Sequence, residues 1–237
     1  MFDIMSDAAN TFQIDQDANR DAGDDIATVD DLILGSAADL KSTSDGRAAP
    51  RFTLLIRAAK IVSSHGEFVC VVRDVSETGV AVRLFHDVPT GDPLELHMPG
   101  GSIYEIRNVW ERENEAGFEF TKTIDVDRII HQFGEFPKRG LRLGLFFPVS
   151  VKALSGASEA IVENLSQQGA RIDSEEDFAI DQTLRLACDE GGGTLKDLRA
   201  KVRWRRDRQY GLVFDDTLSL NDFARFAARL QCPKLLD

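Results

Sequence analysis

Two arginines four residues apart, Arg47 and Arg51, are the first residues of this chain whose type and spacing suit ligand binding. The planar guanidinium fork of arginine can pair bidentately with a phosphate or with O6 and N7 of guanine, and it can stack on a purine ring. On an extended segment, two forks at this spacing can reach different parts of one ligand. The pair therefore suits an anionic ligand such as a nucleotide.

A second motif, Asp74-Val-Ser76-Glu-Thr-Gly79, begins 23 residues after Arg51. The N1–H and N2–H₂ groups of guanine are donors, so the Asp74 carboxylate is a matched acceptor. Ser76 can add a hydroxyl group or orient the turn, and Gly79 can allow a positive φ or a close approach of the backbone to the ligand. The alternative interpretation is an ordinary Asx-type turn with two solvated arginines elsewhere on the surface.

The same order of residues recurs about ninety positions later. The second copy contains Lys138-Arg139-Gly-Leu-Arg142 and Asn164-Leu-Ser166-Gln-Gln-Gly169. Each copy closes with a tryptophan seven residues before a glycine: Trp110 before Gly117, and Trp204 before Gly211. A period this long indicates tandem domains rather than a solenoid. We predict an acidic tail over residues 1–45, a first domain over 46–134 and a second over 135–237.

The patterns between these motifs predict an all-β fold with short helices. We expect strands over 68–73, where Phe68, Cys70 and Val72 alternate with Val69, Val71 and Arg73, and over 80–82, 94–96, 104–110 and 117–120. A turn at 89–93 and a polar hairpin loop at 111–116 lie between them. Five or six short strands in about eighty residues favour a small closed antiparallel barrel. We expect a helix after each barrel, over 125–133 with Gly134 as its stop, and from the capping residue Ser219 onward.

Together these residues resemble the PilZ domain, a bacterial receptor for cyclic di-GMP. The resemblance rests on Arg47-x-x-x-Arg51, on Asp74-x-Ser76-x-x-Gly79 and on a closing strand that ends in Gly-Phe-x-Phe at Phe120. It covers about residues 47–231, and the second copy resembles a degenerate PilZ domain because Lys138 replaces the first arginine. The resemblance implies two tandem antiparallel β-barrels of PilZ type, each followed by a C-terminal helix.

The resemblance also implies the ligand and its site. Cyclic di-GMP would bind, without any cofactor, to the five motif residues of the first copy: Arg47, Arg51, Asp74, Ser76 and Gly79. The second copy is either a second ligand site or a structural platform that docks against the first barrel. The residues of that second candidate site are Lys138, Arg139, Arg142, Asn164, Ser166 and Gly169.

As a receptor, the chain would change conformation on binding and signal to an unidentified protein target that controls motility, exopolysaccharide production or biofilm formation. The alternative is a PilZ-fold interaction scaffold that binds no nucleotide. An enzyme is not expected, because the four histidines are scattered without metal-ligand spacing, and neither a nucleophile elbow nor a P-loop is present.

Composition limits the partners and the compartment. Residues 1–45 hold eleven aspartates against Arg20 and Lys41, which predicts a largely disordered tail, although a short helix over about 25–40 is conceivable. The net charge of −12 argues against a nucleic-acid partner. The sequence shows neither a signal peptide nor a long apolar run, and its cysteines are odd in number. We therefore predict a cytoplasmic protein without membrane insertion.

A basic run over 199–208 alternates arginine and lysine with apolar residues. Alternation predicts that Arg199, Lys201, Arg203 and Arg205 face one side of a strand, and that Ala200, Val202 and Trp204 face the other. The basic face is then either the polar outside of a barrel strand or a docking surface for the acidic tail or an acidic partner.

Overall fold

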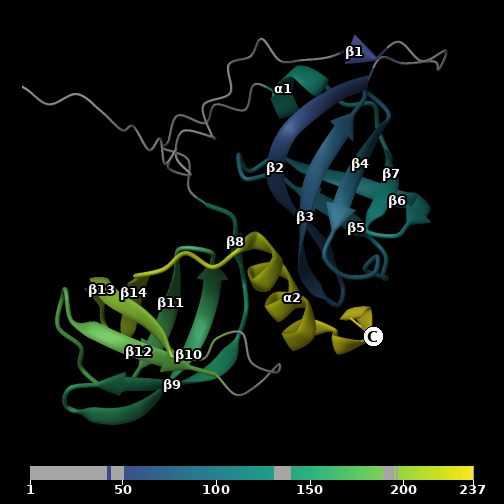
Figure 1. Cartoon of the computed structure of the whole chain (residues 1–237). Helices are drawn as coiled ribbons and strands as arrows, with labels where there is room; N and C mark the ends of the chain where they lie inside the picture. The colour runs from purple at the N-terminus through teal and green to yellow at the C-terminus, as the bar shows by residue number, and fades with distance from the viewer. Residues whose placement is uncertain (1–41, 44–50, 131–139, 189–194, 196, 237) are drawn as a thin grey trace, which may run out of the picture. The chain divides into compact units, whose positions relative to one another are not determined.

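The computed structural model describes residues 42–43, 51–130, 140–188, 195 and 197–236, with 42–43, 51–56, 128 and 130 described as backbone only. The acidic tail, and the helix conceived within it, lie outside the described residues. In the described part strands predominate and helices are short, which confirms the predicted fold class (Figure 1). The predicted boundaries near 45 and 134 fall in segments that are not described, so they stay predictions.

The first barrel is a closed ring of six antiparallel strands. Their spatial order is β2 (Arg51–Ser63), β3 (Gly66–Val75), β4 (Gly79–Leu84), β7 (Glu115–Phe120), β6 (Ile103–Arg112) and β5 (Leu94–His97). Pairing of Ile61 in β2 with Leu96 in β5 closes the ring, which leaves no open sheet edge between them. The short β1 (Ser42–Thr43) adds to the start of β2.

The second barrel repeats this topology. Its ring is β11 (Gly169–Ser174), β14 (Gln209–Phe214), β13 (Leu198–Arg206), β12 (Thr183–Ala187), β9 (Phe147–Ala153) and β10 (Gly156–Ser166), closed by pairing of β10 with β11. The short β8 (Arg142–Leu143) also pairs with β10. Because β8 and β9 both pair with β10, they together take the place that the single strand β2 has in the first barrel.

One hairpin is tighter than the sequence predicts. We expected a polar loop over 111–116, but β6 continues to Arg112 and β7 begins at Glu115. The turn needs only Glu113 and Asn114, because Glu113 adopts a left-handed conformation with φ 49°. Short hairpins commonly require such a positive φ.

Both predicted helices are present. α1 (Val126–Ile130) follows the first barrel, and its expected continuation to Phe133 and Gly134 lies outside the described residues. α2 (Leu220–Gln231) follows the second barrel, and the Ser219 hydroxyl accepts the Asp222 N–H at 3.1 Å, as the capping prediction requires. The 3₁₀ helix η2 (Pro233–Leu236) ends the described chain. No helix in the described part is both long and apolar enough to cross a membrane.

Helix α2 is buried on two sides. Phe223 and Phe226 belong to the core of the second barrel, whereas Ala228 packs in a separate cluster with Leu235 of η2 and Phe68 of β3. The start of β3 is consequently buried on both of its faces. This explains why Phe68 to Val72 form an uninterrupted apolar run instead of alternating with polar residues.

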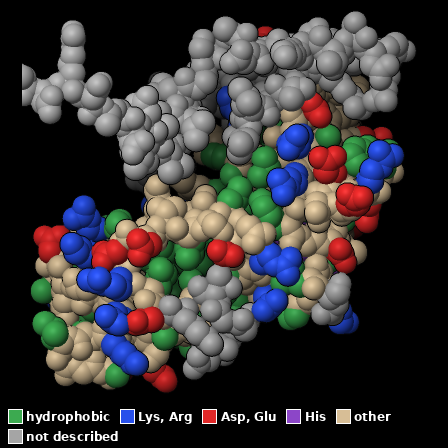
Figure 2. Space-filling model, viewed as in Figure 1, with side chains coloured by type: hydrophobic (Ala, Val, Ile, Leu, Met, Phe, Trp, Pro, Cys, Tyr) green, Lys and Arg blue, Asp and Glu red, His purple; other side chains and the backbone are tan. Residues whose placement is uncertain are grey.

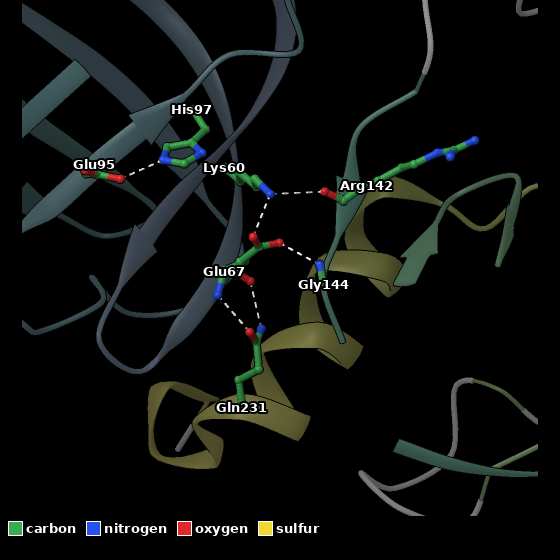
Figure 3. Close-up of polar contacts among 7 residues, drawn as sticks. All are labelled: Lys60, Glu67, Glu95, His97, Arg142, Gly144 and Gln231. Atoms are coloured by element: carbon green, nitrogen blue, oxygen red, sulfur yellow. Dashed lines mark hydrogen bonds and ion pairs between the residues drawn. The ribbon is translucent and has the colours of Figure 1, made fainter. Parts of the chain in front are cut away.

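Polar contacts fix the same junction around Glu67 (Figure 3). The Glu67 carboxylate accepts hydrogen bonds from Lys60 Nζ and from the Gly144 N–H, both at 2.7 Å. The Gln231 side chain accepts the Glu67 N–H and donates to the Glu67 carbonyl oxygen, again at 2.7 Å each. Lys60 Nζ also donates to the Arg142 carbonyl oxygen at 3.3 Å. Side chains of β2, β3 and α2 therefore satisfy backbone groups at this junction.

We predict that Gln231→Ala lowers the free energy of unfolding by about 1–3 kcal/mol, because the variant leaves the Glu67 backbone groups without their partners. Denaturant unfolding followed by circular dichroism measures this change. Lys234→Ala, which truncates an exposed side chain of η2, is the matched control. Equal stability of the two variants would contradict the prediction.

The buried His86 makes stability depend on pH. Burial lowers the pKa of His86 from its ordinary value near 6.5, against the opposing effect of the Asp87 carbonyl oxygen 2.7 Å from Nδ1. The unfolded chain therefore binds this proton more readily than the folded chain, so stability falls as the pH drops below about 6.5. We expect His86→Asn to weaken this dependence in unfolding measured between pH 5 and 8. An unchanged pH dependence in His86→Asn would contradict the prediction.

Candidate functional site

The motif serine builds the turn between β3 and β4. The Ser76 hydroxyl accepts the Gly79 N–H at 3.2 Å and donates to the Gly79 carbonyl oxygen at 3.3 Å, and the Ser76 N–H donates to the same oxygen at 2.8 Å. Only 7% of Ser76 is exposed. Of the two roles considered for Ser76, the structure therefore favours orientation of the turn.

Gly79 is required for close packing. A Cβ atom at this position would lie 2.8 Å from the Phe118 carbonyl oxygen of β7, and the φ of Gly79 lies outside the left-handed region. The close approach at Gly79 is therefore to the neighbouring strand β7. Gly79 does not adopt the positive φ that the sequence analysis considered.

A β-bulge precedes Asp74. The register between β3 and β4 shifts between Val72 and Asp74, and Asp74 then pairs with Ala81. The inward-facing Val72 is fully buried, whereas Asp74 is partly exposed on the outside of the barrel. A bulge re-aims the side chains that follow it, which places this carboxylate on the outer face.

A second bulge, between Asn108 and Trp110 in β6, exposes an aromatic ring beside the motif. Trp110 is 39% exposed, and a Cβ atom at Gly117 would lie 1.9 Å from its Nε1. The indole therefore lies directly over Gly117. The sequence shows the same spacing of a tryptophan seven residues before a glycine in each copy. That pattern alone did not predict that Trp110 lies beside the motif.

These residues line one open cavity of about 290 Å³ on the outside of the first barrel. It brings the Asp74 carboxylate, the Ser76–Gly79 turn and the Trp110 indole together. Glu119 lines the same cavity from β7. The cavity offers an aromatic surface and hydrogen-bond acceptors, the combination needed to stack a base and pair with its donors.

The arginine segment reaches the same edge of the barrel. Arg51 begins β2, where the next two residues, Phe52 and Thr53, pair with Val75 and Asp74. The backbone register therefore carries Arg51 to the end of β3 at which the motif turn begins. Arg47 lies outside the described residues, and Arg51 is described as backbone only.

The second barrel repeats the scaffold. The backbone of Arg142 pairs directly with Ser166, whose hydroxyl donates to the Gly169 carbonyl oxygen at 3.0 Å. A Cβ atom at Gly169 would lie 2.1 Å from the Leu212 carbonyl oxygen, so this glycine also serves close packing. Asn164 follows a bulge, as Asp74 does. Lys138 and Arg139 lie outside the described residues.

The predicted orientation of Trp204 is wrong. Alternation assigned it to the same face as Ala200 and Val202, which are buried, yet 44% of Trp204 is exposed. A bulge between Val202 and Trp204 shifts the register and turns the ring outward, over Gly211. Trp204 therefore occupies in the second barrel the position that Trp110 has in the first.

The basic residues of β13 are exposed, as expected, but they do not share one face, because the same bulge leaves Arg205 opposite the buried Tyr210. Three of these arginines pair within the same barrel. Arg199 contacts Asp215 at 3.5 Å, Arg203 contacts Asp181 at 3.3 Å, and Arg205 pairs with Asp177. Figure 2 shows basic and acidic side chains interspersed on this barrel. Docking of the acidic tail here stays a prediction, because the tail lies outside the described residues.

Nothing in the described residues suggests a metal centre, since no group of three histidine, cysteine, aspartate or glutamate side chains is arranged to hold an ion. Cys70, Cys188 and Cys232 are free thiols, and the first two are buried. His131 lies outside the described residues.

Comparison with known proteins gives one family. Residues 45–133 and 138–230 each match the PilZ domain. No curated protein matches the chain.

Several solved structures are similar to this chain. PlzA of Borreliella burgdorferi in complex with c-di-GMP is 11% identical, with 74% of this chain and 88% of that chain covered and a TM-score of 0.32. The inhibitor of motility MotI/DgrA of Bacillus subtilis is 12% identical, with 76% and 98% covered and a TM-score of 0.32. YcgR of Escherichia coli in complex with c-di-GMP is 10% identical, with 74% and 80% covered and a TM-score of 0.28.

Proposed function

The chain belongs to the PilZ domain family, and from that premise we propose that it is a receptor for cyclic di-GMP. The observation that carries the proposal is the cavity on the first barrel, which gathers Asp74, the Ser76–Gly79 turn and Trp110. Two bulges in different strands turn the carboxylate and the indole toward the same space. Their convergence supports a binding site more strongly than an ordinary surface turn.

Each group has a matched part of the ligand. The Asp74 carboxylate accepts from guanine N1–H and N2–H₂, and Trp110 offers a face for stacking, worth about 1–3 kcal/mol per base. Arg47 and Arg51 supply forks for a phosphate or for guanine O6 and N7. Ser76 and Gly79 act on the ligand indirectly, by fixing the turn that holds Asp74.

The proposed receptor is not an enzyme. In the first-barrel cavity the Ser76 hydroxyl is engaged by the Gly79 backbone to form the turn, and the arginines would bind and orient the ligand. Ligand binding through the Arg47–Arg51 segment would change the surface presented to a protein target in the cytoplasm. Control of motility, exopolysaccharide production or biofilm formation is the output that the family resemblance suggests.

Calorimetric titration with cyclic di-GMP tests the proposal. We expect Arg51→Ala to weaken binding roughly ten- to a hundredfold, because a lost charge-assisted hydrogen bond costs about 1.5–3 kcal/mol. Arg112→Ala is the matched control, since Arg112 is an exposed arginine of the same barrel at the β6–β7 hairpin. If the parent chain bound no ligand at high concentration, the interaction scaffold without nucleotide binding would be the better account.

Tryptophan fluorescence gives an independent readout. Trp110 and Trp204 are the two tryptophans of the chain, so Trp204→Phe leaves Trp110 as the sole reporter. We expect cyclic di-GMP to change Trp110 emission in this variant as a base stacks on the exposed indole. Binding by calorimetry without any change in emission would exclude Trp110 from the site.

A further inference from the structure

The two barrels share a scaffold but differ at one position that faces the candidate site. In the first barrel the strand partner of Asp74 is Ala81, and Ala81 lines the cavity. In the second barrel the strand partner of Asn164 is Arg171. A long cationic side chain thus stands where the first barrel has a single methyl group.

Arg171 forms an ion pair on this outer face. Its Nε lies 2.7 Å from Glu163 Oε2, and the Gln209 side chain donates to the same oxygen at 2.9 Å. The Glu163 side chain is only 18% exposed. Side chains from β10, β11 and β14 therefore meet across the face that corresponds to the open cavity of the first barrel.

This arrangement opposes guanine binding in two ways. The arginine and its partner carboxylate occupy space that a base would need beside Asn164. Arginine also carries only donors, so Arg171 cannot accept from guanine N1–H and N2–H₂, and it engages the neighbouring Glu163 carboxylate that otherwise could. A ligand would have to displace Arg171 from a partly buried ion pair. In the first barrel, Ala81 leaves the corresponding space open.

The geometry points to Arg171 as the residue that closes the second barrel to cyclic di-GMP, and to Ala81 as the residue that keeps the first barrel open. The inference rests on the proposed function and deepens it: the chain holds one ligand site, and its second barrel is a platform of the same fold. The difference is local to the strand pair that follows each motif turn.

Titration of four variants tests this assignment. The Arg51→Ala/Asp74→Ala chain removes both the arginine and the carboxylate of the first site, so it reports on the second barrel, where we expect no binding. Adding Arg171→Ala to it should create a measurable second-barrel site. In the otherwise unchanged chain, Ala81→Arg should weaken binding at least a hundredfold, while Ser64→Arg, the control at an exposed position of the β2–β3 turn outside the cavity, should bind within a fewfold of the parent.

The outcomes separate the two proposals. No binding to the parent chain would overturn the proposed function and this inference with it. Binding to the parent that persists in the Arg51→Ala/Asp74→Ala chain would overturn the inference alone, as would a folded Arg51→Ala/Asp74→Ala/Arg171→Ala chain that binds nothing. Circular dichroism establishes folding, and should Ala81→Arg fail to fold, the Arg171→Ala result decides.

Discussion

The candidate site depends on β-bulges. In a regularly alternating strand, Asp74 and Trp110 would each point to the same face as the residue two positions earlier. The extra residue before each one shifts the register and turns both side chains to the outside of the same barrel wall. The bulges recur before Asn164 and Trp204, so they belong to the fold of both copies. Bulges locally disrupt the ladder, and here they occur where a closed barrel must present functional side chains.

Strand β3 connects the two functional regions of the described chain. Its C-terminal end carries Asp74. At its N-terminal end, Glu67 and Phe68 contact the C-terminal helix of the second barrel. The stretch from Phe68 to Val72 is buried throughout, so its side chains pack on both faces of the strand. One strand therefore extends from the candidate site to the contacts with the C-terminal helix.

Duplication preserved the scaffold and changed the chemistry. Both copies keep a serine that forms the turn, a glycine required by a carbonyl oxygen of the next strand, and a tryptophan lying over a glycine. They differ at Asp74 and Asn164, and at Ala81 and Arg171. Positions that hold the backbone were thus retained, whereas the side chains that would face a ligand diverged.

The sequence by itself determined the tandem organisation, the all-β fold, the capping of α2 by Ser219 and the motif turns, because these depend on local spacing and periodicity. It also identified Asp74, Ser76 and Gly79 as neighbours in one turn. Only the tertiary structure decided that Trp204 faces outward, that Trp110 lines the site, and that Arg171 pairs with Glu163. Those facts depend on a register shift and on contacts between strands distant in sequence, which strict alternation cannot encode.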